Sequence, residues 1–284
     1  MLSNRLAAGG GRRIPEAVLE RDYCIAWFLI GLSSSPLRDQ LAFKGGTALK
    51  RCYFGEYRFS EDLDFTLLSE ATLDAIVAQL DHVFEDVRRL SGVVLRYSRE
   101  ERDEHENTYE FYIGYEGPLP GASREIKVNI TIRELLVWQL TNQPVLRAYD
   151  EYTDLPEGAL VQAYALEEIA TEKIMALTDP ARNEPRDLYD LWFLVTGRHV
   201  DLGELRSGLE QKLAFKGRDA LRLGELLVGK EARLRRDWVR RLSGQMVELP
   251  EFDSVFRAVQ RSLRQARLAG GSAMRNTGRR KRRR

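Results

Sequence analysis

The chain has 284 residues, 43% of them hydrophobic and 31% charged, which is an ordinary globular composition with room for one large or two modest domains. No apolar run approaches the roughly 18 residues of a membrane span, and the N-terminus lacks a signal-peptide core, so we expect a cytoplasmic protein that does not use a membrane. Two cysteines (Cys24 and Cys52) and three scattered histidines argue against a disulfide framework or a Cys/His zinc site.

The formal net charge of +1 is unevenly distributed. Residues 265–284 contain eight Lys and Arg and no acid, so residues 1–264 carry about −7 (1 − 8). A segment of Gly, Ser, Asn and Arg cannot bury apolar surface, which predicts a disordered basic tail over residues 265–284. Contact with a polyanion such as RNA and a purely solubilising role are both consistent with that tail.

The predicted elements divide the chain into an α/β half and a helical half. Apolar periodicity predicts helices over residues 15–32 and 73–90, a helical turn over 37–42, and a short helix over 47–54 closed by Gly55. Strand patterns cover residues 63–68, 93–97, 108–115 and 126–132. Helices follow over residues 166–178, 186–196, 202–213, 219–227, 231–244 and 253–268.

The order of these elements predicts an α+β fold with a small mixed sheet. Residues 141–163 are rich in Pro, Asp and Gly and mark the expected boundary. We therefore expect an α/β domain over residues 1–160 and a helical domain over 161–264 that completes a shared cleft. No long heptad or apolar stripe favours an obligate dimer, so a monomer is expected.

The most informative motif is Lys44-Gly45-Gly46-Thr47, followed thirteen residues after Thr47 by Ser60-Glu61-Asp62-Leu63-Asp64-Phe65. A glycine pair that opens a helix lets the backbone approach phosphate oxygens. In a strand, Asp62 and Asp64 fall on one face and offer the hard oxygen ligands that Mg²⁺ prefers. An isolated pair of this kind is more often a solvated strand end, but the preceding glycines favour a nucleotidyltransferase. A Walker A loop is rejected because Lys44 precedes the glycines.

Two further candidates lie in the helical half. Lys173 falls on or beside an apolar helix stripe, where its ammonium must reach solvent or meet an anion such as a triphosphate. A lysine at the edge of a packed helix is the alternative. Asp187 lies near the start of the next helix, where the helix dipole alone would explain a carboxylate. In a functional interpretation, Asp187 orients Lys173 while Arg182 or Arg186 meets phosphate.

Four motifs in this order resemble those of the AbiEii/MenT family over residues 41–195: Gly45-Gly46-Thr47, Ser60–Phe65, Glu172-Lys173-Ile174 and Arg186–Leu191. The family comprises toxins of type IV-like toxin–antitoxin and abortive-infection systems with a polymerase-β-like nucleotidyltransferase fold. The resemblance implies transfer of a nucleotide from an NTP with Mg²⁺ or Mn²⁺ as the cofactor. It also implies a cognate antitoxin, and some members act on tRNA acceptor ends.

The resemblance further implies roles for individual residues. Catalytic roles are implied for Asp62, Asp64, Lys173 and Asp187, of which Asp62 and Asp64 would hold the metal. Nucleotide binding is implied for a set on both halves: Lys44, Gly45, Gly46, Thr47, Ser60, Lys173 and Arg186.

One position departs from the polymerase-β-like pattern, which places a third carboxylate on a neighbouring strand. The matching strand here carries Asn129, which can accept a hydrogen bond or weakly ligate a metal but cannot act as a general base. Either Glu110 or Asp187 takes that role, or the reaction relies on metal and positioning.

The sequence therefore predicts a toxin that transfers nucleotides from an NTP to an RNA acceptor, the tRNA 3′ end, and so blocks translation. The alternatives are nucleotidylation of a protein or small molecule, and a weakly catalytic NTP-binding regulator. A nucleic-acid-binding protein that uses only its basic tail would leave the glycine and aspartate motifs unexplained.

Overall fold

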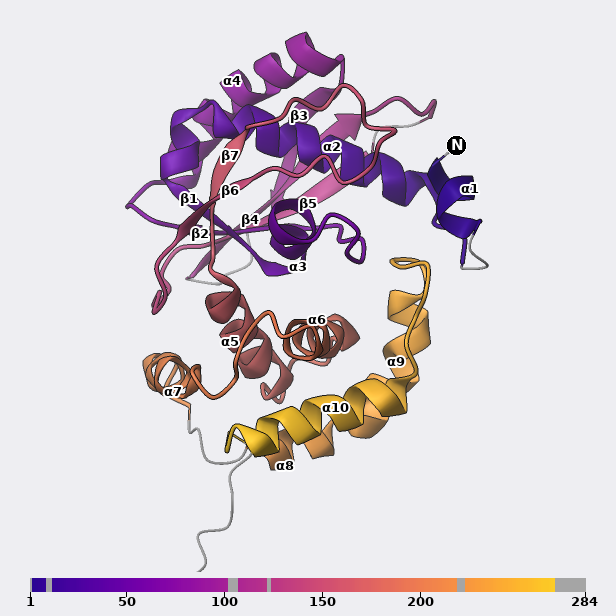
Figure 1. The fold of residues 1–284 in the computed structure, drawn as a ribbon. Coiled ribbons are helices and arrows are strands. Elements are labelled where there is room, and N and C mark those ends of the chain that lie inside the picture. Colours follow the sequence, from indigo (N-terminus) through magenta and orange to yellow (C-terminus); the bar gives the residue numbers. More distant parts are fainter. Residues whose placement is uncertain (1, 9–11, 102–106, 122–123, 219–222, 269–284) are drawn as a thin grey trace, which may run out of the picture.

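The computed structural model describes residues 2–8, 12–101, 107–121, 124–218 and 223–268. Within these ranges, seven strands form one mixed sheet in the order β3-β4-β5-β2-β1-β7-β6 (Figure 1). The strands are β1 (Leu41–Lys44), β2 (Leu63–Leu67), β3 (Val94–Glu101), β4 (Thr108–Glu116), β5 (Arg124–Thr131), β6 (Thr141–Pro144) and β7 (Leu160–Ala163). Strand β2 is antiparallel to β1 but parallel to β5, and β1 is parallel to β7.

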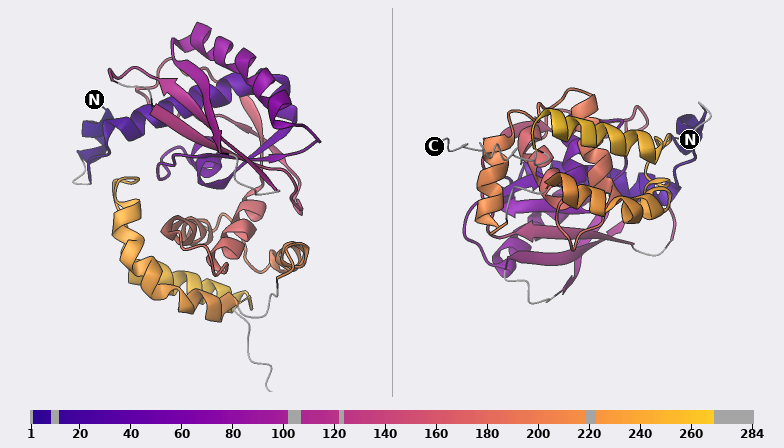
Figure 2. Two further views of the ribbon diagram at one scale, coloured as in Figure 1. Left: turned by 180° about the vertical axis from the view of Figure 1, so that it is seen from behind. Right: turned by 90° about the horizontal axis from the view of Figure 1, so that it is seen from below.

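Two long helices, α2 (Glu16–Ser33) and α4 (Leu73–Ser91), cover one face of the sheet (Figures 1 and 2). The sheet offers them an apolar surface, because alternate residues of β5, namely Ile126, Val128 and Ile130, are buried there. Helix α4 begins at the cap Thr72, whose hydroxyl accepts a hydrogen bond from the Ala75 N–H at 3.3 Å. A shorter helix, α1 (Leu2–Ala7), precedes this layer.

The opposite face of the sheet is polar and carries a row of paired residues. Lys44 is opposite Asp64, Asp64 is opposite Asn129, and Asn129 is opposite Glu110. Directly paired residues point to the same side of a sheet, so this row runs across β1, β2, β5 and β4. The polar face is turned toward the helical half of the chain (Figure 1).

The helical half follows β7 directly and lies below the sheet in Figure 1. Its α-helices are α5 (Leu166–Leu177), α6 (Pro185–Thr196), α7 (Arg206–Phe215), α8 (Leu223–Gly229), α9 (Glu231–Leu242) and α10 (Phe252–Gln265). The segment between α9 and α10 returns to the other half, where the Phe59 N–H donates to the Gln245 carbonyl at 2.7 Å and the Arg12 N–H donates to the Val247 carbonyl at 2.9 Å.

The expected α+β class, with a mixed sheet and a helical second half, is confirmed. The turn expected over residues 37–42 is wrong in its second half, because a 3₁₀ turn (Pro36–Asp39) gives way to β1. The helix expected over residues 47–54 begins earlier, as α3 (Gly45–Ala48), and continues as a π-helical segment (Leu49–Tyr53). Strands β6 and β7, which the sequence analysis did not predict, lie within the expected boundary segment 141–163.

The basic tail expected over residues 265–284 lies outside the described residues from residue 269 onward. Gln265 ends α10, and Leu268 is buried. None of the helices in the described part of the chain is both long and apolar enough to span a membrane.

Candidate active site

The glycine pair and the acidic pair meet where two central strands of the sheet end and begin. Strand β1 ends at Lys44, and the antiparallel strand β2 begins at Leu63, so the turn after β1 lies beside the start of β2. Gly45 makes this turn with φ +78°, a conformation that favours glycine. The Thr47 hydroxyl donates to the Asp62 carbonyl oxygen at 2.5 Å, which fixes the backbone that presents the acidic pair.

A cavity of about 800 Å³ lies between the polar face of the sheet and helices α5, α6 and α7. Its described lining holds eight Lys or Arg and six Asp or Glu, a formal net charge of +2 (8 − 6). The basic residues are Lys44, Lys127, Lys173, Arg182, Arg186, Lys212, Lys216 and Arg218, and the acids are Asp62, Asp64, Glu134, Glu172, Asp179 and Asp187. A polar, positively charged cavity beside paired carboxylates suits an anionic ligand that brings a metal ion.

Asp62 and Asp64 both line this cavity, and each is held through one oxygen. Asp62 Oδ2 accepts a hydrogen bond from Arg186 at 3.3 Å, and Asp64 Oδ1 accepts one from the Asn129 amide at 3.0 Å. Asp64 Oδ2 lies so close to Gly45 that a Cβ built there would come within 2.8 Å of it. The acidic pair is therefore oriented from both sides, by the turn and by α6.

Lys173 belongs to a buried charge cluster. Its ammonium lies 2.8 Å from Asp187 Oδ1 and 2.7 Å from Asp190 Oδ2. Asp187 also accepts from Arg182 Nε at 2.7 Å, and Asp190 accepts from Arg58 Nε at 2.6 Å. Three cations thus share two carboxylates, which leaves one positive charge in excess where Lys173 and Arg182 line the cavity.

Burial and ion pairing shift the pKa values of this cluster in opposite directions, and the effect of ion pairing is the larger. Burial alone would lower the pKa of Lys173, but Asp187 and Asp190 raise it above its usual value. Burial alone would raise the pKa of Asp187, but Lys173 and Arg182 hold it below its usual value. Burial would likewise raise the pKa of Asp190, but Arg58 and Lys173 hold it below its usual value. Lys173, Asp187 and Asp190 are therefore all charged at neutral pH.

The structure brings most of the predicted site residues together in one cavity. The residues that line it are Lys44, Gly45, Asp62, Asp64, Lys173, Arg186 and Asp187. Gly46, Thr47 and Ser60 are buried behind this lining, with Gly46 packed against Arg58. Their predicted role in nucleotide binding stays a prediction.

The profile of the family described as "Nucleotidyl transferase AbiEii toxin, Type IV TA system" matches residues 27–259. The chain belongs to this AbiEii family. The match extends well beyond the residues 41–195 on which the resemblance of the motifs rested, and it includes helices α7 to α9.

Solved structures with the same fold include other nucleotidyltransferases. MenT4, nucleotidyltransferase toxin Rv2826c from Mycobacterium tuberculosis H37Rv, has a TM-score of 0.60 at 18% identity, over 94% of this chain and 88% of that one. A putative nucleotidyltransferase from H. pylori has a TM-score of 0.58 at 17% identity, over 89% and 96%. JHP933 from Helicobacter pylori has a TM-score of 0.57 at 17% identity, over 89% and 93%. No curated protein matches the chain.

The residues of this AbiEii site suit a divalent cation that arrives with its substrate. Asp62 and Asp64 each keep one carboxylate oxygen beyond those bound to Arg186 and Asn129, and hard oxygens are the ligands that Mg²⁺ and Mn²⁺ prefer. Within the described residues, no group of three or more His, Cys, Asp and Glu could hold a metal. Two protein carboxylates together with phosphate oxygens are the donor set that this arrangement offers.

The two carboxylates considered as replacements for the one missing at Asn129 are both engaged in ion pairs. Asp187 is bound by Lys173 and Arg182, and its lowered pKa makes it a poor proton acceptor. Glu110 lies in the polar row beside Asn129 but is paired with Lys127 at 2.6 Å. This geometry favours a holding role for Asp187 in the AbiEii site.

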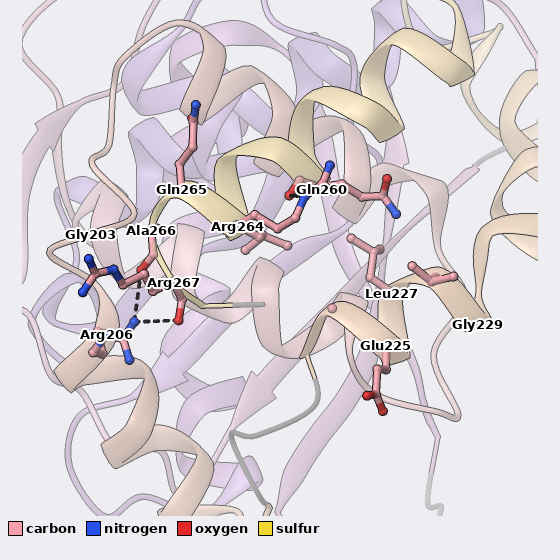
Figure 3. A pocket seen from close by; sticks show the side chains of 13 residues that line it. Gly203, Arg206, Glu225, Leu227, Gly229, Gln260, Arg264, Gln265, Ala266 and Arg267 are labelled. Carbon is pink, nitrogen blue, oxygen red and sulfur yellow. Dashed lines mark hydrogen bonds between the residues drawn. The ribbon is translucent and has the colours of Figure 1, made fainter. Parts of the chain in front are cut away.

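A second cavity of about 1130 Å³ lies between α7, α8 and α10 (Figure 3). Arg206 crosses one end of it and donates to the carbonyl oxygens of Ala266 and Arg267 at 3.1 and 2.6 Å. Of the described residues that line it, Glu225 is the single acid, so it lacks the paired carboxylates of the AbiEii site.

Sequence reasoning did not assign roles to Arg58 or Asp190, which complete the charge cluster around Lys173. Two signals were available. Arg58 is a cation between the aromatic residues Tyr57 and Phe59, and Asp190 lies three residues after Asp187 and so on the same helix face. Pairing between residues 58 and 190, however, depends on the way α6 packs against the segment that precedes β2.

Proposed function

We propose that this AbiEii family member transfers a nucleotide from an NTP to the 3′ hydroxyl of an RNA, the tRNA 3′ end, with Mg²⁺ or Mn²⁺ bound at Asp62 and Asp64. The observation that carries the proposal is the single cavity in which this acidic pair faces the Lys173–Asp187 pair across a lining of net positive charge. Blocked tRNA 3′ ends would stop translation, which accounts for a cytoplasmic toxin and a cognate antitoxin partner.

In the proposed reaction, the RNA hydroxyl oxygen bonds to the α-phosphorus of the NTP and the hydroxyl proton passes to solvent water. The bond from that phosphorus to the oxygen that bridges it to the β-phosphorus breaks, and pyrophosphate leaves. Lys173 would hold the triphosphate, and Asp187 would keep the ammonium charged and aimed into the cavity. Arg186 would orient Asp62, and Asn129 would orient Asp64. When bound, the divalent cation would neutralise the charge that develops on the phosphates.

The position of Asn129 also supports a weakly catalytic NTP-binding regulator as a second candidate. Asn129 Nδ2 donates to Asp64 at 3.0 Å, so it serves as a clamp on a carboxylate and not as a base. A site that positions substrates without a general base reacts more slowly, since such a base typically contributes about 10²–10⁴-fold.

The test is to incubate the purified protein with total tRNA, Mg²⁺ and each α-³²P-labelled NTP in turn, beside the Asp62→Asn variant. Label in tRNA that disappears in Asp62→Asn supports the proposal and identifies the donor. A matched control is Asp253→Asn, which removes an exposed carboxylate on α10.

Two results would redirect the proposal. Label on proteins but not on tRNA, with the corresponding mass change, would assign a protein acceptor. NTP binding without label in any macromolecule and without pyrophosphate release would assign the regulator.

A further inference from the structure

Asp190 concentrates an unusual number of donors on one fully buried carboxylate. Its Oδ1 accepts from the Tyr57 hydroxyl and from Arg58 Nε, both at 2.6 Å. Its Oδ2 accepts from Arg58 Nη2 at 2.8 Å and lies 2.7 Å from the Lys173 ammonium. One side chain of α6 therefore ties the segment that precedes β2 to α5.

Arg58 connects this carboxylate to the glycine turn. Its side chain is 1% exposed, and a Cβ added to Gly46 would overlap its Nη2. Its Nη1 donates to the Phe59 carbonyl and to Gln245 Oε1, both at 3.2 Å. Neither Arg58 nor Asp190 is among the residues that line the cavity, so any effect on a ligand is exerted through their neighbours.

Stability alone is a poor explanation for this arrangement. A buried ion pair is commonly no more stabilising than apolar residues of the same volume. Here Arg58, Lys173 and Arg182 outnumber Asp187 and Asp190 by one positive charge. The Lys173 ammonium has three N–H donors, and Asp187 and Asp190 take two of them, which leaves the third for an anion in the cavity.

We infer that Arg58 and Asp190 are positioning residues for the donor nucleotide: they hold the Lys173 ammonium and the Gly45–Gly46 turn in a fixed relation on two sides of its phosphates. The inference rests on the proposed function because it takes an NTP as the ligand. It assigns no chemical step to either residue.

The Asp190→Asn variant separates positioning from simple charge, since the two effects have opposite signs. Loss of a buried negative charge beside Lys173 would by itself strengthen the binding of an anion. Loss of the carboxylate that fixes Lys173 would instead weaken it by about tenfold or more, the usual effect of losing a charge-assisted hydrogen bond. Isothermal titration with a non-hydrolysable NTP analogue and Mg²⁺ measures the dissociation constant of the folded protein directly.

A matched control is available in the α/β half of the chain. Asp22 and Arg51 form a second buried ion pair, with side chains 2% and 0% exposed, and neither residue lines the cavity. Asp22→Asn is expected to lower thermal stability, as Asp190→Asn does, but to leave the dissociation constant within about twofold of wild type.

Two further variants complete the test. Arg58→Lys keeps the positive charge but loses the bidentate contact with Asp190. Like Asp190→Asn, it is expected to weaken binding of the analogue. In a Lys173→Ala background, Asp190→Asn is expected to weaken binding by a smaller factor than in the wild type, since the part of its effect that passes through Lys173 is already lost.

The outcomes divide cleanly. Wild-type protein that does not bind the analogue would overturn the proposed function and this inference with it. Wild-type binding with unchanged or tighter binding by Asp190→Asn would overturn the inference alone. If Asp190→Asn does not fold, Arg58→Lys decides, and failure of both to fold would assign the pair a purely structural role.

Discussion

Gly45 makes the turn after β1 and also lies against Asp64, a proposed metal ligand. Gly45→Ala should therefore lower activity by much more than it lowers stability. A residue other than glycine at φ +78° costs about 1–2 kcal/mol, of which about 0.4–1 kcal/mol is recovered through the less flexible unfolded chain. We expect a net loss of about 1 kcal/mol, or about 2–4 °C in Tm for a chain of this size.

The larger effect of Gly45→Ala should fall on the reaction. The new Cβ would lie 2.8 Å from Asp64 Oδ2, closer than real Cβ contacts allow, so the carboxylate must move. A displacement of about 1 Å can cost about 10²-fold in rate, and a shift of a few tenths of an ångström should cost about tenfold. The assay is tRNA labelling as a function of Mg²⁺ concentration, in which half-maximal activity should require more metal.

Gly92→Ala is the control for this prediction. Gly92 closes α4 at φ +77°, and a Cβ there would meet nothing within 4 Å. It should lose the same stability as Gly45→Ala while keeping full activity. Full activity of Gly45→Ala at limiting Mg²⁺ would refute the assignment of Asp64 as a metal ligand, and equal inactivation by Gly92→Ala would show that the loss reflects instability.

Three further predictions concern the same site. Lys173→Met should destabilise the fold by about 3 kcal/mol, because it leaves two buried carboxylates with fewer cations, and urea unfolding would measure this. The stability lost in Asp187→Asn should depend on pH: the native pKa lies below the unfolded value of about 3.9, so the difference from wild type should be full above about pH 4 and shrink as the pH falls. A difference that grows toward acid would contradict this. Asn129→Ala should free Asp64 Oδ1 and lower labelling about tenfold without a comparable change in Tm, and unchanged labelling would remove Asn129 from the site.

Local patterns were sufficient for the long elements. Helices α2, α4, α5 and α6 and strand β5 all lie within two residues of their predicted bounds. Helix α4 and strand β5 show a clear apolar period, and α2 is long and buried without interruption over residues 24–32. The short strands were missed for two different reasons. Residues 41–43 of β1 are all buried and so show no alternation, and β6, Thr-Asn-Gln-Pro, has polar residues with little strand preference.

The acidic pair and its glycine turn could be found from sequence because both are local in the chain. The partners of Lys173 could not be found in the same way. Asp190 joins Lys173 only because α5 and α6 pack side by side, and Arg58 joins them only because the segment before β2 reaches α6. The spacing of residues along the chain does not predict such contacts. A charged residue between two aromatic residues, as Arg58 is, does indicate that it is buried and has an oppositely charged partner elsewhere in the chain.

The residues that line the active-site cavity are synthesised far apart in time. They run from Lys44 to Arg218, a separation of 174 residues (218 − 44), which at about 5–20 residues per second takes roughly 9–35 s to translate. The sheet also depends on distant partners, since Asp64 pairs with Asn129 and Phe43 with Ala163. Closure of such long loops slows folding. A nascent chain that already carries both aspartates therefore has no complete cavity, and synthesis is well advanced before the host meets an active toxin.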